Sequence, residues 1–137
     1  MKVYIAAQFS RLPEMRALIP VFQEHNLFIC SRWLQEKCSP NVKLHELSPK
    51  YHGETAEIDI EDIDSCGLFV FFSEDPLLGI PRGGRHVEFG YALAKGKRIA
   101  VIGPYENTFH YLPQVQHYPS VQEFLDSEGI QNVELAD

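Results

Sequence analysis

The segment best suited to chemistry is the run Pro81-Arg82-Gly83-Gly84-Arg85-His86-Val87-Glu88, which follows an apolar strand and opens a helix. Adjacent glycines let the backbone turn tightly and approach a ligand closely, and N–H groups at a helix start attract anions. We therefore interpret Gly83 and Gly84 as substrate-binding, and we expect Arg82 and Arg85 to add bidentate contacts to a phosphate or carboxylate. The spacing matches neither G-x-G-x-x-G nor the P-loop, so no dinucleotide or ATP site is predicted. A plain glycine-rich turn is the competing interpretation.

Two acidic residues, Glu88 and Asp59, form the predicted reactive pair. Glu88 lies about one turn into its helix, where the helix dipole and two nearby arginines favour the ionised carboxylate. We expect Asp59 to lie at the rim of the core, whereas Asp62 and Asp64 are interpreted as solvated charges. Paired carboxylates of this kind serve glycosyl transfer: one attacks the anomeric carbon and the other handles the proton of the leaving base. For Glu88, the competing interpretation is a helix-start glutamate that only complements the dipole.

Apolar spacing predicts the elements that position these residues. A helix that begins at Pro13 is expected to kink or break at Pro20, and Ala56, Ile60 and Ile63 share one face of a second helix. The predicted strands are 3–7, 27–30, 67–72, 98–102 and, at an edge, 132–135, and the later helices are 54–65, 85–95 and 121–127.

Strands that alternate with helices imply right-handed crossovers and a parallel sheet covered on both faces. The prediction is a single α/β domain over 1–137, with a doubly wound parallel sheet in a three-layer sandwich. Ligands of such sheets bind beyond the carboxyl ends of the strands. The segments after Ala7, Cys30, Phe72 and Ile102 are therefore expected on one rim.

Composition narrows the function classes. The chain has 137 residues, 45% of them hydrophobic, and a net charge of −7, which argues against a basic surface for a nucleic-acid polymer. No apolar run reaches the ~18–20 residues of a membrane span, and no signal peptide is predicted. Three cysteines without a C-x-x-C pair indicate a reducing cytoplasm. The histidines lack metal-ligand spacing, so neither a metal nor an organic cofactor is predicted.

Several of these residues together resemble the nucleoside 2-deoxyribosyltransferase family, whose relatives include 2′-deoxynucleoside 5′-monophosphate N-glycosidases. The resemblance covers roughly residues 1–107 and implies a flavodoxin-like fold that assembles at least as a homodimer. It rests on Tyr4, on Ala56-x-x-Asp59-Ile60-x-x-Ile63 and on Gly84-x-x-x-Glu88-Phe89-Gly90-Tyr91-Ala92-Leu93-Ala94-x-Gly96-Lys97.

The resemblance assigns roles to the matching residues. Glu88 matches a nucleophile that forms a covalent deoxyribosyl intermediate, Asp59 matches the aspartate that assists the leaving base, and Tyr4 matches the tyrosine that orients the nucleophile. The transferases carry an aspartate six residues before the glutamate, where this chain has Arg82. That departure favours a 5′-monophosphate substrate over base exchange, because the glycosidases contact phosphate in this region.

Four further residues are predicted to bind substrate. Ser10 and Arg11 follow the first strand, where the relatives also hold phosphate. Trp33 is expected to stack on a base, with a packed rim tryptophan as the equal alternative. Asn107 lies where the family's partner-contributed residues tend to arise. Two other functions stay open: a non-catalytic nucleotide-binding or sensing module, and an N-glycosidase acting on NAD-like dinucleotides.

Overall fold

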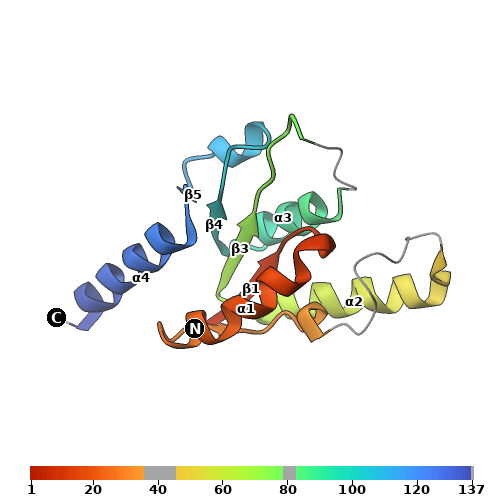
Figure 1. Cartoon of the computed structure of the whole chain (residues 1–137), viewed down its shortest axis with the longest axis horizontal. Helices are drawn as coiled ribbons and strands as arrows, with labels where there is room; N and C mark the ends of the chain where they lie inside the picture. The colour runs from red at the N-terminus through yellow and green to blue at the C-terminus, as the bar shows by residue number, and fades with distance from the viewer. Residues whose placement is uncertain (36–45, 79–82, 137) are drawn as a thin grey trace.

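The computed structural model describes residues 1–35, 46–78 and 83–136, and its strands form one parallel sheet (Figure 1). The strand order is β2-β1-β3-β4-β5, so the direction of winding reverses between β1 and β3. This confirms the predicted doubly wound α/β architecture. The strands are β1 (Lys2–Ala6), β2 (Phe28–Ile29), β3 (Leu68–Phe72), β4 (Arg98–Ile102) and β5 (Val115–Tyr118).

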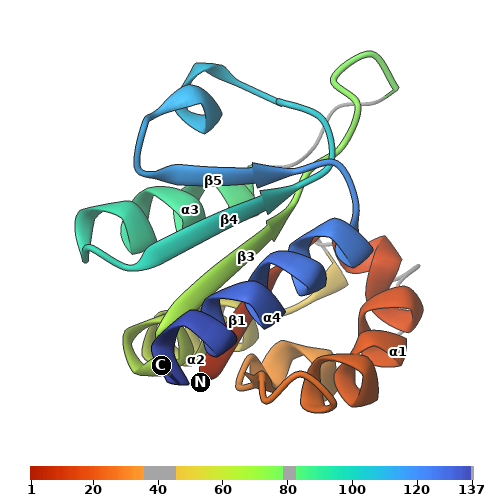
Figure 2. The same cartoon turned by 90° about the vertical axis from the view of Figure 1, so that its left-hand side faces the viewer.

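Helices cover both faces of the sheet (Figure 2). One face packs against α1 (Leu12–Gln23) and α4 (Val121–Ala136), and the other packs against α2 (Pro49–Ser65) and α3 (Gly84–Ala94). Within the described residues, every helix is too short or too polar to cross a lipid bilayer.

Strand alternation decides which side chains meet the site. In β1, Val3 and Ile5 enter the α1/α4 core, whereas Tyr4 and Ala6 enter the α2/α3 core. Tyr4 pairs in register with Phe69 of β3, and their rings stack with centroids 5.6 Å apart. All of β3 is buried, as the unbroken apolar run predicts for a central strand covered on both sides.

The carboxyl ends of β3 and β4 lie in close contact. The Ser73 amide donates to the Ile102 carbonyl over 3.0 Å, and the Ser73 hydroxyl donates to the same oxygen over 3.2 Å. Gly103 has a φ of +115°, and a Cβ built on it would lie 2.5 Å from the Ser73 Oγ. Only glycine fits here, because both the dihedral angle and the space exclude a side chain.

Several sequence predictions at the chain's less regular parts were wrong. The helix α1 does not break at Pro20, because the proline lies in the last turn and its carbonyl still accepts from the Glu24 amide. The helix predicted over 54–65 begins earlier, at Pro49, and extends past the sheet (Figure 1), and Ala56 on it is exposed. The predicted edge strand 132–135 is the end of α4, and β5 takes the edge position instead.

Candidate active site

Tyr4 and Glu88 meet on the α2/α3 face of the sheet. Tyr4 is fully buried, and its hydroxyl donates a hydrogen bond to the Glu88 Oε2. Glu88 lies on α3 between the buried residues Arg85 and Phe89 and is itself partly exposed. Helical spacing turns its carboxylate toward β1 while leaving it accessible. Two of the three predicted catalytic residues are therefore in direct contact.

The third predicted catalytic residue, Asp59, comes from α2, which packs against α3. Asp59 is partly exposed, and its negative charge raises the pKa of both Tyr4 and Glu88. Three separate elements thus bring Tyr4, Asp59 and Glu88 into one electrostatic environment. Such a grouping of two carboxylates and a phenol is suited to proton transfer and to nucleophilic attack.

The ionisation of Glu88 differs from the sequence prediction. Burial and the charge of Asp59 raise the pKa of Glu88 to about 8, despite the Tyr4 hydrogen bond and the positive charge of Arg85, which both act to lower it. The expectation that this carboxylate is favoured in its ionised form was wrong. Burial also raises the pKa of Tyr4 far above its ordinary value, with the charges of Glu88 and Asp59 adding to it.

The glycine-rich turn begins α3. Gly83 caps the helix with a φ of +90°, and its carbonyl accepts from the amides of His86 and Val87 over 3.0 and 3.1 Å. Open space surrounds the Cα of both Gly83 and Gly84, as close approach of a ligand requires. Arg82, like residues 36–45 and 79–81, lies outside the described residues.

Arg85 does not turn outward to bind a phosphate. It is 6% exposed, and its Nη1 and Nη2 donate to the two carboxylate oxygens of Glu106 over 2.9 and 2.7 Å. Nη1 also donates to the Phe72 carbonyl. The predicted bidentate contact exists, but its carboxylate belongs to the chain itself. No local sequence pattern singles out Glu106, because its partner Arg85 lies 21 residues away.

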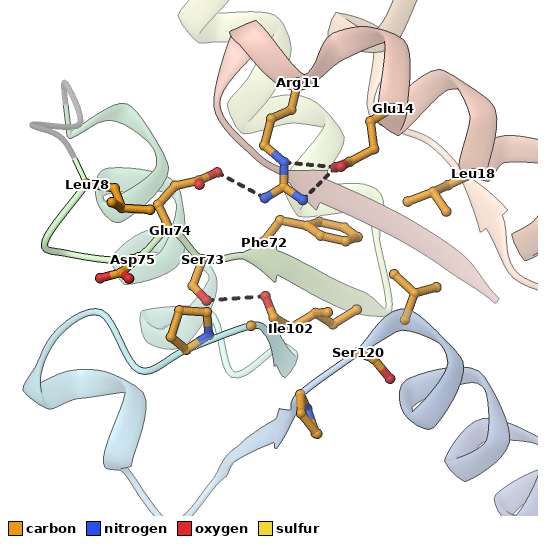
Figure 3. Close-up of a pocket in the computed structure, with 14 residues that line it drawn as sticks. Arg11, Glu14, Leu18, Phe72, Ser73, Glu74, Asp75, Leu78, Ile102 and Ser120 are labelled. Atoms are coloured by element: carbon orange, nitrogen blue, oxygen red, sulfur yellow. Dashed lines mark hydrogen bonds and ion pairs between the residues drawn. The ribbon is translucent and has the colours of Figure 1, made fainter.

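Arg11 lies over the opposite face of the sheet. Its guanidinium is 5.4 Å from the ring centre of Phe72, a member of the α1/α4 core, and it donates to Glu14 and Glu74 (Figure 3). These side chains line a cavity of about 710 Å³ at the carboxyl ends of β3 and β4. Ser10 is exposed and donates to the Gln8 side chain. No hydrogen bond among the described residues joins Ser10 or Arg11 to Glu88, and their roles in binding phosphate stay predictions.

Trp33 and Asn107 have partners within the chain. The Trp33 indole N–H donates to the Ile5 carbonyl over 2.6 Å, and the ring packs at the rim of both cores. The Asn107 Oδ1 caps the short 3₁₀ helix η4 (Thr108–Tyr111) by accepting from the Phe109 amide. Its Nδ2 lies 3.3 Å from the His86 Nδ1. Roles in base stacking and in a partner's site stay predictions.

Asp62 differs from the predicted solvated charge. It is 5% exposed and accepts from the Arg32 amide over 2.8 Å and from the Arg32 Nε over 2.9 Å. Arg32 is in the short 3₁₀ helix η2 (Arg32–Gln35), which the sequence pattern did not indicate. Asp64 is at the surface as predicted, where it accepts from the Tyr91 hydroxyl. In the part of the chain that the structure describes, no cluster of His, Cys, Asp and Glu side chains is arranged to hold a metal ion.

Comparison with known proteins adds evidence on the fold. No protein-family model and no curated protein sequence matches the chain. A CMP N-glycosidase of Clostridium botulinum superposes with a TM-score of 0.59 at 22% identity, covering 95% of this chain and 99% of that one. A conserved protein from Enterococcus faecalis V583 gives the same TM-score at 16% identity, covering 96% and 98%. The chain therefore shares, over nearly its whole length, the α/β fold of these two proteins.

Proposed function

We propose that this chain is an N-glycosidase that cleaves the base–sugar bond of a 2′-deoxyribonucleoside 5′-monophosphate or of the corresponding nucleoside. The observation that carries the proposal is the convergence of Tyr4, Asp59 and Glu88 from β1, α2 and α3. The fold shared with a CMP N-glycosidase supports it, as does the resemblance of the sequence to the deoxyribosyltransferase family.

The proposed reaction has two steps and needs no cofactor. In the reactive form of the pair, the proton that Glu88 holds in the free protein has moved to Asp59, so Glu88 is ionised. The Glu88 carboxylate bonds to C1′, the C1′–N bond breaks, and its electron pair leaves with the base, which takes the proton from Asp59. Asp59 then accepts a proton from water as the water oxygen attacks C1′, which releases the sugar and regenerates the Glu88 carboxylate. The Tyr4 hydroxyl orients Glu88 through its hydrogen bond. This is the retaining sequence of a two-carboxylate site.

We propose that the phosphate of a 5′-monophosphate lies at the start of α3. The backbone at Gly83 and Gly84 has room for it, and a helix N-terminus favours an anion. Arg82, Ser10 and Arg11 are proposed contacts, although Arg11 already shares its guanidinium with Glu14 and Glu74. Trp33 and Asn107 are retained as proposed contacts to the base and to a homodimer partner.

The test incubates purified protein with CMP, dCMP, other 5′-monophosphates and their nucleosides, and measures free base by chromatography. We expect base and sugar phosphate in equal amounts, together with a sugar adduct on Glu88 detected by mass spectrometry. A second base added to the assay reveals transfer in place of hydrolysis. Binding without base release for every substrate would favour the sensing module, and release of nicotinamide from NAD would favour the dinucleotide glycosidase.

A further inference from the structure

One carboxylate close to the candidate site has no place in the proposed reaction. Glu106 lies in the segment that follows β4 and receives hydrogen bonds from two other segments. Its oxygens accept from Arg85 on α3 and from the Glu74 amide, the latter over 3.2 Å. The His86 Nε2 also lies 3.4 Å from its Oε1. Glu106 therefore connects the segment after β3, the start of α3 and the segment after β4.

The backbone of Glu106 also takes part in a hydrogen bond. Its amide donates to the His110 Nδ1 over 3.1 Å, and His110 is 1% exposed between Phe71 and Phe89. Burial lowers the pKa of His110 to about 4, so its ring is neutral at neutral pH and Nδ1 can accept that hydrogen bond. Burial alone would raise the pKa of Glu106, but hydrogen bonds from Arg85 and the Glu74 amide lower it. Arg85 thus holds Glu106 in its ionised form.

Arg85 and Glu88 lie three residues apart on the same side of α3, so the segment that fixes one also fixes the other. Glu88 is faced by Tyr4 from β1, by Asp59 from α2 and by Arg85 from its own helix, and Arg85 is the positive group among these three. The position and charge of Arg85 therefore act directly on Glu88.

We propose that Arg85 and Glu106 are positioning residues that hold the first turn of α3 on the end of β3 and set the electrostatic environment of Glu88. Glu106 has two effects: its hydrogen bonds keep Arg85 in place, and its negative charge partly offsets the positive charge that Glu88 experiences. The inference extends the proposed function, because it concerns the same carboxylate, but it can be tested without turnover.

The experiment follows the ionisation of Glu88 directly, by titrating the ¹³C signal of its carboxyl group in the wild type, in Glu106→Gln and in Arg85→Lys. In Glu106→Gln the charge of Arg85 is no longer offset, so the Glu88 titration should move to lower pH by about half a unit. In Arg85→Lys the charge remains but the two-pronged contact is lost, so the midpoint should stay within about 0.2 unit while kcat falls several-fold.

The matched control is Glu128→Gln. Arg98 donates to both oxygens of Glu128, which is 3% exposed on the α1/α4 face. This variant should lose a similar amount of thermal stability and leave the Glu88 titration unchanged. Equal midpoints in Glu106→Gln and Glu128→Gln would overturn the inference, as would an unchanged kcat in an active Arg85→Lys enzyme.

The two proposals can fail separately. A wild type that releases no base, but whose Glu88 titration responds to Glu106→Gln alone, would refute the glycosidase and retain the positioning role. If Glu106→Gln does not fold, the Glu88 titration is compared instead between Arg85→Gln and its control, Arg98→Gln. The Glu88 midpoint should then rise in Arg85→Gln only, and a midpoint that does not rise would overturn the inference.

Discussion

On the α1/α4 face of the sheet, carboxylates lie against arginines: Glu128 binds Arg98, and Glu14 and Glu74 share the guanidinium of Arg11. On the α2/α3 face, Glu88 is bound by the neutral hydroxyl of Tyr4 and lies near a second carboxylate, Asp59. In the first arrangement each carboxylate has a positively charged partner, whereas in the second the surroundings of Glu88 disfavour its charged form.

The difference does not follow from the face alone, since Asp62 and Glu106 also lie on the α2/α3 side and bind Arg32 and Arg85. Among the described residues, Glu88 thus departs from the usual pairing of buried carboxylates with arginine. A partly buried carboxyl group with a raised pKa is typical of reactive sites. The comparison therefore separates structural ion pairs from the group that we expect to react.

The largest expected effect is on turnover in Glu88→Gln. The amide has nearly the same shape but cannot form the glycosyl ester, so base release should fall by roughly 10³-fold or more. The measurement is free base per minute from the preferred monophosphate. The control Glu128→Gln removes a carboxylate from the other face and should keep most of the activity, whereas an equal loss in both variants would contradict the comparison.

Asp59→Asn should reduce kcat by roughly 10²-fold, because the leaving base loses its proton donor. A substrate whose leaving group needs no proton, such as a nitrophenyl deoxyriboside, should recover most of the lost rate. Equal losses with both substrates would assign Asp59 a structural role instead.

Tyr4→Phe removes the hydrogen bond that lowers the pKa of Glu88, so the ionised form should become harder to reach. We expect kcat to fall roughly tenfold, and we expect the limb of the pH–rate profile that is centred near 8 in the wild type to move to higher pH. Tyr118→Phe is the matched control, since the Tyr118 hydroxyl lies 3.1 Å from the Ser127 Oγ on the α1/α4 side. A shift of the same size in both variants would argue against the Tyr4 contact.

The raised pKa of Glu88 also predicts a pH dependence of stability. The folded state binds the Glu88 proton more tightly than the unfolded chain does. The stability that this proton adds is therefore complete below about pH 4.5 and is lost as the pH rises through about 8. Relative to the wild type, Glu88→Gln should therefore gain roughly 1–3 kcal/mol of unfolding free energy between pH 5 and pH 9. Urea melts across this range measure it. Gln23→Ala, an exposed and uncharged position on α1, should show a constant difference.

The smallest expected effect belongs to Arg11→Ala. Because its guanidinium is shared with Glu14 and Glu74, we expect KM for a monophosphate to rise only about two- to fivefold, with KM for the nucleoside unchanged. An equal change in KM for the monophosphate and for the nucleoside would show that Arg11 serves only in its ion pairs with Glu14 and Glu74.

The sequence predicts the parts of this fold that local patterns determine. The strands β1, β3 and β4 and the helix α3 follow from apolar runs and from the glycines around Glu88, and the contact of Tyr4 with Glu88 agrees with the family resemblance. The failures have long-range causes. Arg85 was interpreted as a ligand contact because its partner Glu106 is remote in sequence, and Asp62 as solvated because Arg32 comes from another segment. The ionisation of Glu88 depends on all these neighbours and on burial, which no local pattern contains.

The close approach of Gly103 to Ser73 affects which glycines at the carboxyl ends of the strands can be substituted. Gly84, at the start of α3, has open space around it and no positive φ. A substitution at this position should therefore cost little stability. Gly103 has no such freedom, because its φ of +115° disfavours any side chain and a Cβ there would lie 2.5 Å from the Ser73 Oγ, which would have to move. A substitution is therefore expected to destabilise the protein much more at Gly103 than at Gly84.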